Sequence, residues 1–165
     1  MQAATKILDH TDLRERVLAY LARHTTLNLA TYGPAGLWAA AVLYVPDGTN
    51  LYFTSVAATR HGQNMVATGR VAGTINDDCT DWGTAKGLQL EGRVVLVDNP
   101  EERLHVVEDY LFRFPFSTAL WHGESNAQVI ARDPGIHGFY RIEPSRLFFM
   151  DNEHAMGKRE ELALG

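Results

Sequence analysis

The residues best suited to chemistry stand in one short stretch, residues 51–69. An apolar strand runs out into two hydroxyl residues, a turn of small residues follows, and a polar triplet then opens a helix. The five candidates are Thr54, Ser55, Thr59, Arg60 and His61. Hydroxyls, a guanidinium, an imidazole and the N–H groups of a helix start together suit an anion, best of all a phosphate. Polar helix starts are common, so this pattern alone also fits a solvated helix N-terminus.

The other polar residues form no comparable group. The remaining histidines lack the spacing of metal ligands, so no zinc or iron site is expected. Three acids in the 76–81 loop resemble a chelating cluster, although such runs are more often solvated loops. They are Asp77, Asp78 and Asp81. No Ser-His-Asp set or catalytic carboxylate pair is evident, so no catalytic side chain is assigned.

The elements that must position the candidates are mostly strands. Period-two alternation between short turns predicts strands at 25–31, 37–45, 51–55, 71–75, 86–97, 138–142 and 146–150. Helical periodicity and capping signals predict helices at 12–24, 59–68 and 99–112, with another within 117–131. Gly69 is placed to end the second of these helices.

Strands joined in this order predict a mainly β fold with inserted helices. Short turns make the first three strands an antiparallel meander, and six or seven such strands favour a closed or nearly closed barrel. We expect a single domain over 1–165, with an N-terminal helix and a helical insertion at about 100–131. The small side chains of Ala39, Ala40 and Ala41 would let a flat ligand or another subunit approach the backbone closely.

Composition narrows the class of protein. The chain has 165 residues, 45% of them hydrophobic, which suits one globular domain. A net charge of −5 argues against nucleic acid as a partner. Cys79 is the only cysteine, which suits a reducing cytoplasm. No signal-like or membrane-spanning apolar run is present, so we expect a cytoplasmic protein without a membrane partner.

An ordered series of motifs carries a family resemblance. The series reads TLNLAT, a small-residue strand, LYFTS, T-R-H, VAGTIN, KGLQLEG, FYRIEP, FFMDN and GK, from about Leu13 to Lys158. It resembles the pyridoxamine 5′-phosphate oxidase-like flavin split barrels, in particular a small bacterial branch of that superfamily. The resemblance implies a six-stranded antiparallel split β-barrel of the FMN-binding type. It also implies a homodimer with two FMN sites at the subunit interface.

The resemblance also implies a set of cofactor-binding residues. The backbone of the second strand would lie along the isoalloxazine ring, and the end of the third would approach the ribityl chain or phosphate. The polar triplet matches the family's Ser-Arg-Lys phosphate triplet, and a glutamine would reach the flavin from the partner subunit. In chain order these residues are Ala39, Ala40, Ala41, Val42, Thr54, Ser55, Thr59, Arg60, His61, Asn64 and Gln89.

Some positions depart from the vitamin-oxidising enzyme of the family. This chain has His61 in place of a lysine, Gln89 where that enzyme's glutamine aligns nearer Gly87, and Trp38-Ala39 in place of an arginine. Its C-terminal region also lacks a clear counterpart of the substrate-binding arginine. We therefore expect an FMN-binding, flavin-dependent oxidoreductase acting on an unknown small molecule.

The alternative is a non-enzymatic binding module of the same fold. Its pocket would be empty or would hold haem or a deazaflavin, as in other relatives of this barrel. For haem, an axial ligand would come from His61, His122 or His137.

Overall fold

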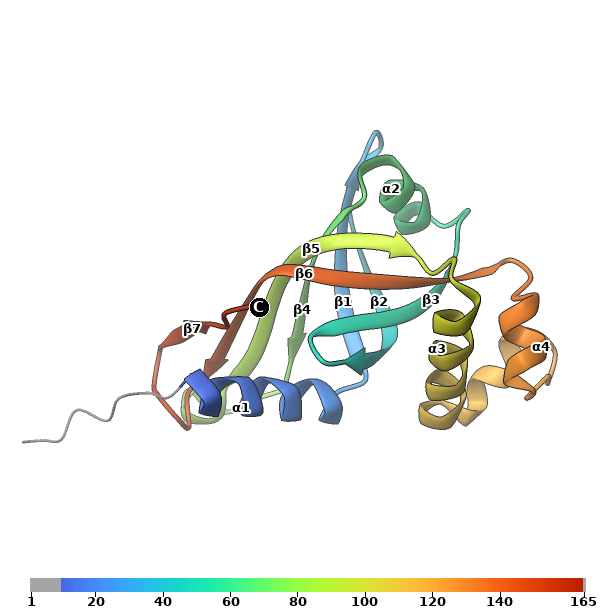
Figure 1. Ribbon diagram of the computed structural model, residues 1–165. Coiled ribbons are helices and arrows are strands. Elements are labelled where there is room, and N and C mark those ends of the chain that lie inside the picture. Colours follow the sequence, from blue (N-terminus) through green and yellow to red (C-terminus); the bar gives the residue numbers. More distant parts are fainter. Residues whose placement is uncertain (1–9, 165) are drawn as a thin grey trace, which may run out of the picture.

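The protein, described here by a computed structural model over residues 10–164, is built around a closed six-stranded antiparallel barrel (Figure 1). Its strands are β1 Thr26–Gly33, β2 Gly36–Asp47, β3 Asn50–Val56, β4 Arg70–Asn76, β5 Lys86–Leu96 and β6 His137–Asp151. They pair in the order β3-β2-β1-β4-β5-β6, and a β3–β6 ladder closes the barrel. A short β7, Arg159–Glu161, pairs with the end of β6. The predicted barrel is confirmed.

Helices cover both ends and one side of the barrel. They are α1 His10–Arg23, α2 Arg60–Thr68, α3 Pro100–Arg113 and α4 Ala127–Arg132, with 3₁₀ turns η1 Trp82–Thr84 and η2 Pro115–Trp121. In Figure 1, α1 lies across the lower end, α2 sits at the upper end, and α3 and α4 pack together at the side. The barrel end that carries α2 is therefore the end where β3 delivers the candidate hydroxyls.

Local signals account for most of these boundaries. In β1 the residues alternate strictly between exposed and buried, as one-sided burial of a strand requires. The α3 helix begins as predicted: Asn99 accepts hydrogen bonds from the amides of Glu101 and Glu102, each at 2.9 Å, and Pro100 follows it. Gly69 ends α2 in the left-handed conformation.

Two apolar cores hold the molecule together. The first fills the barrel and includes the inward face of α1, with Val17 and Leu21 fully buried. The second lies outside the barrel wall, where α3, η2 and α4 pack through Trp121 and Tyr110 onto Phe139 of β6. The helical insertion is thus fixed to the outer face of the β3–β6 pair.

The prediction of two strands at 138–142 and 146–150 is wrong, because they form the single strand β6. Glu143-Pro144-Ser145 has the composition of a turn, but Pro144 lies opposite Gly92 of β5, at a β-bulge that leaves Ser145 of β6 without a pair in this ladder. A bulge tolerates a residue without an N–H group. The strand therefore bends through the proline without ending.

The helix predicted within 117–131 is also corrected. The structure has the 3₁₀ turn η2 and the short α4, separated by a loop. His122 and Gly123 both adopt positive φ, at 54° and 89°, which ends a right-handed helix. Asn126 then caps α4 by accepting from the amides of Gln128 and Val129.

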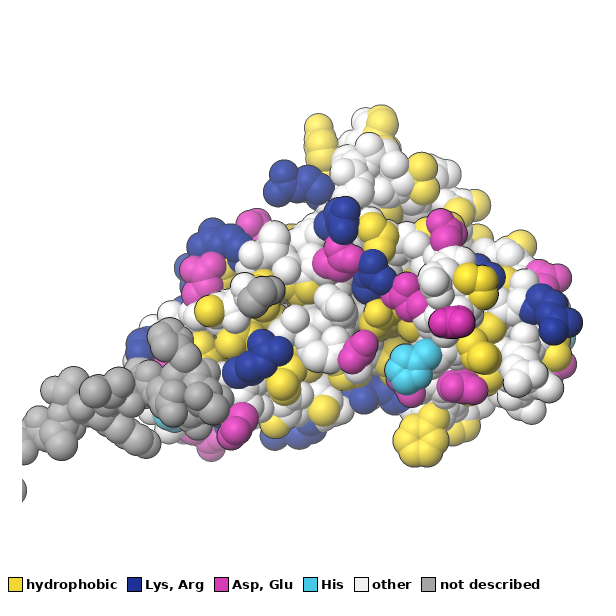
Figure 2. All heavy atoms as spheres, viewed as in Figure 1, with side chains coloured by type: hydrophobic (Ala, Val, Ile, Leu, Met, Phe, Trp, Pro, Cys, Tyr) yellow, Lys and Arg dark blue, Asp and Glu magenta, His cyan; other side chains and the backbone are white. Residues whose placement is uncertain are grey.

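The surface seen in Figure 2 mixes charges of both signs. Basic and acidic side chains alternate with exposed apolar ones and do not gather into a field of one sign. None of the helices in residues 10–164 is both long and apolar enough to cross a membrane.

Candidate functional site

Three polar side chains meet where β3 ends and α2 begins. Ser55 Oγ lies 2.6 Å from Nε2 of His61 and 3.4 Å from Oγ1 of Thr59. Ser55 is buried, whereas Thr59 and His61 are half-buried. The structure therefore brings three of the five sequence candidates into one hydroxyl–imidazole cluster.

The α2 N-terminus is shaped by the residues around this cluster. Thr59 is the N-cap: its hydroxyl donates to the carbonyl oxygen of Val56 at 2.8 Å and accepts from the amide of Gly62 at 3.1 Å. A side chain at Gly62 would stand 2.7 Å from the Val56 carbonyl oxygen, so glycine permits this tight turn. The amides of Arg60 and His61 belong to the first turn, where no intrahelical acceptor exists. These groups suit an anion.

Burial lowers the pKa of His61 below its ordinary value. At neutral pH the imidazole is therefore uncharged and exchanges a hydrogen bond with the Ser55 hydroxyl.

Arg60 points away from the cluster. Its Nη2 donates to the carbonyl oxygens of Ala35, at 2.6 Å, and Leu37, at 3.2 Å, at the turn between β1 and β2. Its guanidinium also lies over the Trp38 ring, 4.6 Å from the centroid. Arg60 thus begins beside the cluster, in the first turn of α2, but its guanidinium binds the hairpin between β1 and β2.

The second strand offers a backbone edge. The β2–β3 ladder ends at the pair Tyr44–Phe53, whereas β1 pairs with β2 along Gly36–Leu43. In the part of the chain that the structure describes, the other edge of Ala39–Val42 therefore has no strand partner. Small side chains leave this backbone accessible to a flat group that can hydrogen-bond to it.

The remaining candidates lie apart from the cluster. The Thr54 hydroxyl donates to the Gly138 carbonyl at 3.1 Å, on the outer face of β3. Asn64 is buried one turn along α2, and its amide donates to the Thr31 hydroxyl at 3.1 Å. Gln89 is exposed on β5 and accepts a hydrogen bond from Arg159 at 3.0 Å.

Sequence reasoning missed two residues that shape this region. Thr31 anchors Asn64 from β1, and its only signal was its place among the inward residues of an alternating strand. Trp38 supports Arg60 and is 42% exposed, whereas a tryptophan is more often buried. A clue was its position in a strand whose first half is apolar on both faces.

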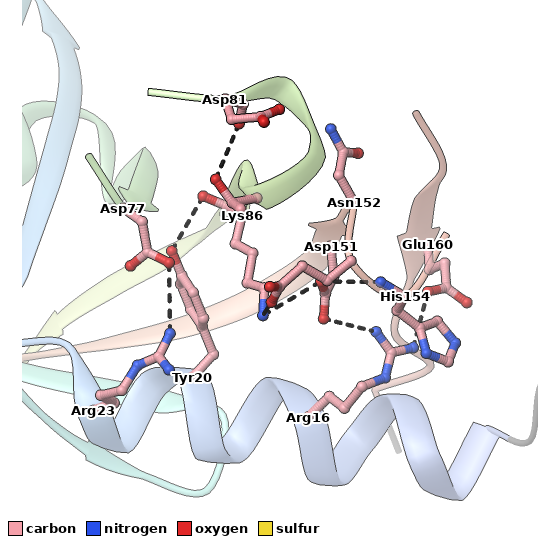
Figure 3. Close-up of polar contacts among 12 residues, drawn as sticks. Arg16, Tyr20, Arg23, Asp77, Asp81, Lys86, Asp151, Asn152, His154 and Glu160 are labelled. Atoms are coloured by element: carbon pink, nitrogen blue, oxygen red, sulfur yellow. Dashed lines mark hydrogen bonds and ion pairs between the residues drawn. The ribbon is translucent and has the colours of Figure 1, made fainter. Parts of the chain in front are cut away.

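A second polar cluster, at the α1 end of the barrel, is charge-compensated (Figure 3). Arg16 pairs with Asp151 at 3.8 Å and Glu160 at 2.9 Å, and Lys86 pairs with Asp151 at 3.6 Å. These pairs join α1 to β5, β6 and β7. The cluster thus fixes the lower end of the barrel.

Two of the acidic loop residues have structural roles. Asp77 pairs with His24 and with Arg23, and Asp81 accepts from the Gly83 amide at 2.7 Å to cap η1. Among residues 10–164, no group of three or more His, Cys, Asp or Glu side chains could hold a metal ion.

A cavity of about 490 Å³ lies between η2, α4 and the start of β6. It is lined mainly by apolar side chains, together with two histidines and two acids: His122, His137, Glu124 and Asp133. His137 stands opposite Val56, so the cavity adjoins the β3 end on its outer face.

Barrel and insertion together define a split-barrel protein. A family model described as pyridoxamine 5′-phosphate oxidase matches residues 13–135, and the chain belongs to this family. A UPF0306 protein of Enterobacter sp. strain 638 is 29% identical over 142 residues, covering 85% of this chain and 89% of that relative.

Solved structures share the fold at low identity. HutZ, a haem storage protein from Vibrio cholerae, aligns with a TM-score of 0.64 and 18% identity, covering 82% of this chain and 93% of that one. A FAD-binding protein from Mesorhizobium loti aligns with a TM-score of 0.62 and 16% identity, covering 81% and 88%. At these identities the likeness establishes the fold.

Proposed function

We propose that the protein binds FMN and is a flavin-dependent oxidoreductase acting on a small molecule. The observation that carries this proposal is that two binding features follow the last β2–β3 pair, Tyr44–Phe53. On β2 this is the unpaired edge of Ala39–Val42, which is on the β3 side of the strand, and on β3 it is the hydroxyl–imidazole cluster where the strand ends. The first suits a flat heterocycle with hydrogen-bonding groups, and the second suits a phosphate. The family and the FAD-binding neighbour support the same reading.

The donor set of the cluster fits a phosphate monoester. Ser55 supplies a hydroxyl, the first turn of α2 supplies amides, and His61 supplies an imidazole, while the Thr59 hydroxyl holds the helix start in place. Arg60 reaches the same anion by leaving the hairpin carbonyls, which are exposed to solvent. Bound flavin would supply hydride-transfer chemistry, while this chain binds and orients it.

The proposed assembly is a homodimer. Tyr32, Leu37 and Trp38 are exposed at the β1–β2 hairpin, and small residues cover the adjoining sheet face. A cavity of about 460 Å³ opens on that face, lined in part by Tyr32 and Leu37. An apolar surface of this kind marks an interface, and through it Gln89 would reach the partner's flavin.

The proposed location is the cytoplasm, because its reducing conditions suit the exposed lone thiol of Cys79.

A second candidate is haem binding. The cavity beside η2 holds two imidazoles and two carboxyl groups among otherwise mostly apolar side chains, and the HutZ fold neighbour is a haem storage protein. The absorption spectrum of the purified protein separates the candidates: bands near ~450 nm indicate flavin, and a strong band near ~400 nm indicates haem. A deazaflavin gives a spectrum distinct from both, and an empty pocket gives none.

FMN titration of the purified protein tests the main proposal. We expect Arg60→Ala to weaken FMN binding about tenfold or more, since a hydrogen bond to a charged group contributes about 1.5–3 kcal/mol. Arg14→Ala is the matched control, because this exposed arginine lies on α1, at the opposite end of the barrel from the cluster (Figure 1). If the folded protein takes up no FMN, the proposal is wrong.

A further inference from the structure

Ser55 has two hydrogen-bond acceptors within reach. The Thr59 hydroxyl gives its own proton to the Val56 carbonyl, so Oγ1 of Thr59 can accept from Ser55. With His61 neutral and Nε2 unprotonated, the Ser55 proton points to that nitrogen, 2.6 Å away. With His61 protonated, Nε2–H donates to Ser55 Oγ, and the Ser55 proton turns toward Thr59. Both protonation states of His61 therefore keep their hydrogen bonds.

The surroundings of His61 contain no acid that could hold this proton. Between Thr26 and Thr68, which spans β1, β2, β3 and α2, the only carboxylate is Asp47. It stands in the β2–β3 turn, at the opposite end of that hairpin from Ser55 (Figure 1). Protonated His61 thus has no anionic side chain beside it on these elements.

The other titratable groups on these elements, and on β6 next to β3, are neutral or cationic. They are Tyr32, Tyr44, Tyr52, Arg60, His137, Tyr140 and Arg141. Arg60 directs its charge to the hairpin, which leaves the cluster without a counter-charge of either sign. Burial disfavours the imidazolium as long as no anion arrives.

We propose that His61 makes phosphate binding at this site proton-coupled, so that a phosphate monoester dianion binds together with one proton taken up from solvent onto His61 Nε2. The inference rests on the proposed function in taking FMN as the phosphate ligand. A lysine at this position is charged at neutral pH and requires no uptake. With histidine at position 61 the affinity for FMN therefore depends on pH, whereas with lysine it would not.

FMN titrations from pH 6.5 to 8.5 test the inference, because the phosphate, with a second pKa near ~6, is mainly a dianion there. We expect the FMN dissociation constant of the native protein to rise toward about tenfold per pH unit, as uptake of one proton requires. His61→Lys should bind FMN with little change across this range. His61→Gln should bind it weakly and without pH dependence.

Three further measurements identify the group that causes the pH dependence. Riboflavin, which lacks the phosphate, should bind equally across the range. Inorganic phosphate should compete with FMN more strongly at the lower pH, which would assign the effect to the phosphate and not to the ring. Calorimetry in buffers of different ionisation enthalpy should show close to one proton taken up by the native protein at alkaline pH, and none by His61→Lys.

The outcomes separate this inference from the proposed function. Parallel pH profiles for the native protein and His61→Lys, with FMN bound by both, would overturn the inference alone. Folded native protein that binds FMN at no pH would overturn the proposed function and the inference with it. Circular dichroism of each variant establishes that a loss of binding is not a loss of fold.

Discussion

Single residues fix how close α2 lies to the barrel. A side chain at Gly33 would overlap the carboxamide of Asn64, and that carboxamide bonds Thr31 on the same strand. The helix start, and with it the hydroxyl–imidazole cluster, is therefore positioned by a buried contact on its far side. Asn64 serves this contact in the present structure, although the family resemblance suggests a place near the cofactor.

At the other end of the barrel, Glu160 gives stability that depends on pH. Burial alone would raise its pKa, but the hydrogen bond from Arg16 and the charges of Arg16 and Lys158 outweigh burial and lower it. A carboxylate with a lowered pKa stabilises the fold above the ordinary glutamate pKa. That contribution is lost as the pH falls through the lowered value.

We therefore expect Glu160→Gln to cost about 1.5–3 kcal/mol at pH 7, and to flatten the loss of stability on acidification below the ordinary glutamate pKa. Urea unfolding across this pH range measures both effects. Glu161→Gln is the control, because its ion pair with Arg146 is exposed and screened by solvent. Equal behaviour of the two variants would contradict the role given to Glu160.

At the scale of elements, the long bent strand β6 depends on the glycine of β5 that faces its bulge. A side chain at Gly92 would stand 2.8 Å from Cα of Pro144 and even nearer the Glu143 carbonyl. Backbone atoms cannot move aside as a flexible side chain can. The glycine is therefore what allows β5 to stay paired past the proline.

Gly92→Ala should destabilise the protein by roughly 1–3 kcal/mol, the usual cost of forced overpacking. Gly87→Ala, on the same strand, meets its nearest atom at 3.6 Å and should cost less. Thermal unfolding of both variants makes the comparison. A Gly87→Ala variant as unstable as Gly92→Ala would mean that the strand itself, not the bulge, rejects alanine.

Elements with local signals could be predicted from the sequence, and those decided by distant partners could not. Thr59 and Gly69 mark the two ends of α2, and Asn99 with Pro100 marks the start of α3. The continuity of β6 could not be predicted, because Glu143-Pro144-Ser145 has the sequence of a turn. It stays in the strand because Gly92 of β5 lies opposite Pro144. Short β7 gave no signal, since it depends on distant partners: it pairs with β6 and forms an ion pair with Arg16 of α1.

The candidate site divides in the same way. Ser55, Thr59 and His61 come together because they are close in sequence across one turn. The direction of Arg60 could not be predicted, because it depends on carbonyls of a hairpin more than twenty residues away. Only the fold reveals that contact.

At the scale of the whole molecule, the exposed hairpin face should decide the oligomeric state. Leu37 is 80% exposed on this face and Phe112 is 90% exposed on α3. We expect Leu37→Asp to convert the dimer to a monomer, since a charge in an apolar interface loses its hydration, and Phe112→Asp to leave the dimer intact. Sedimentation velocity measures both. A native protein that is monomeric at all concentrations would refute the proposed dimer.

The unpaired edge of β2 at Ala39–Val42 has a consequence for solubility. An open strand edge is a template on which another chain can add a strand, and proteins commonly blunt such edges with charged side chains. Arg60, lying over the start of β2 with its charge on the carbonyls of Ala35 and Leu37, does this while no ligand is bound. A cofactor bound along this edge, with Arg60 on its phosphate, would cover the edge in place of the arginine. Protein that lacks both the cofactor and the Arg60 side chain should therefore be the form most prone to aggregate.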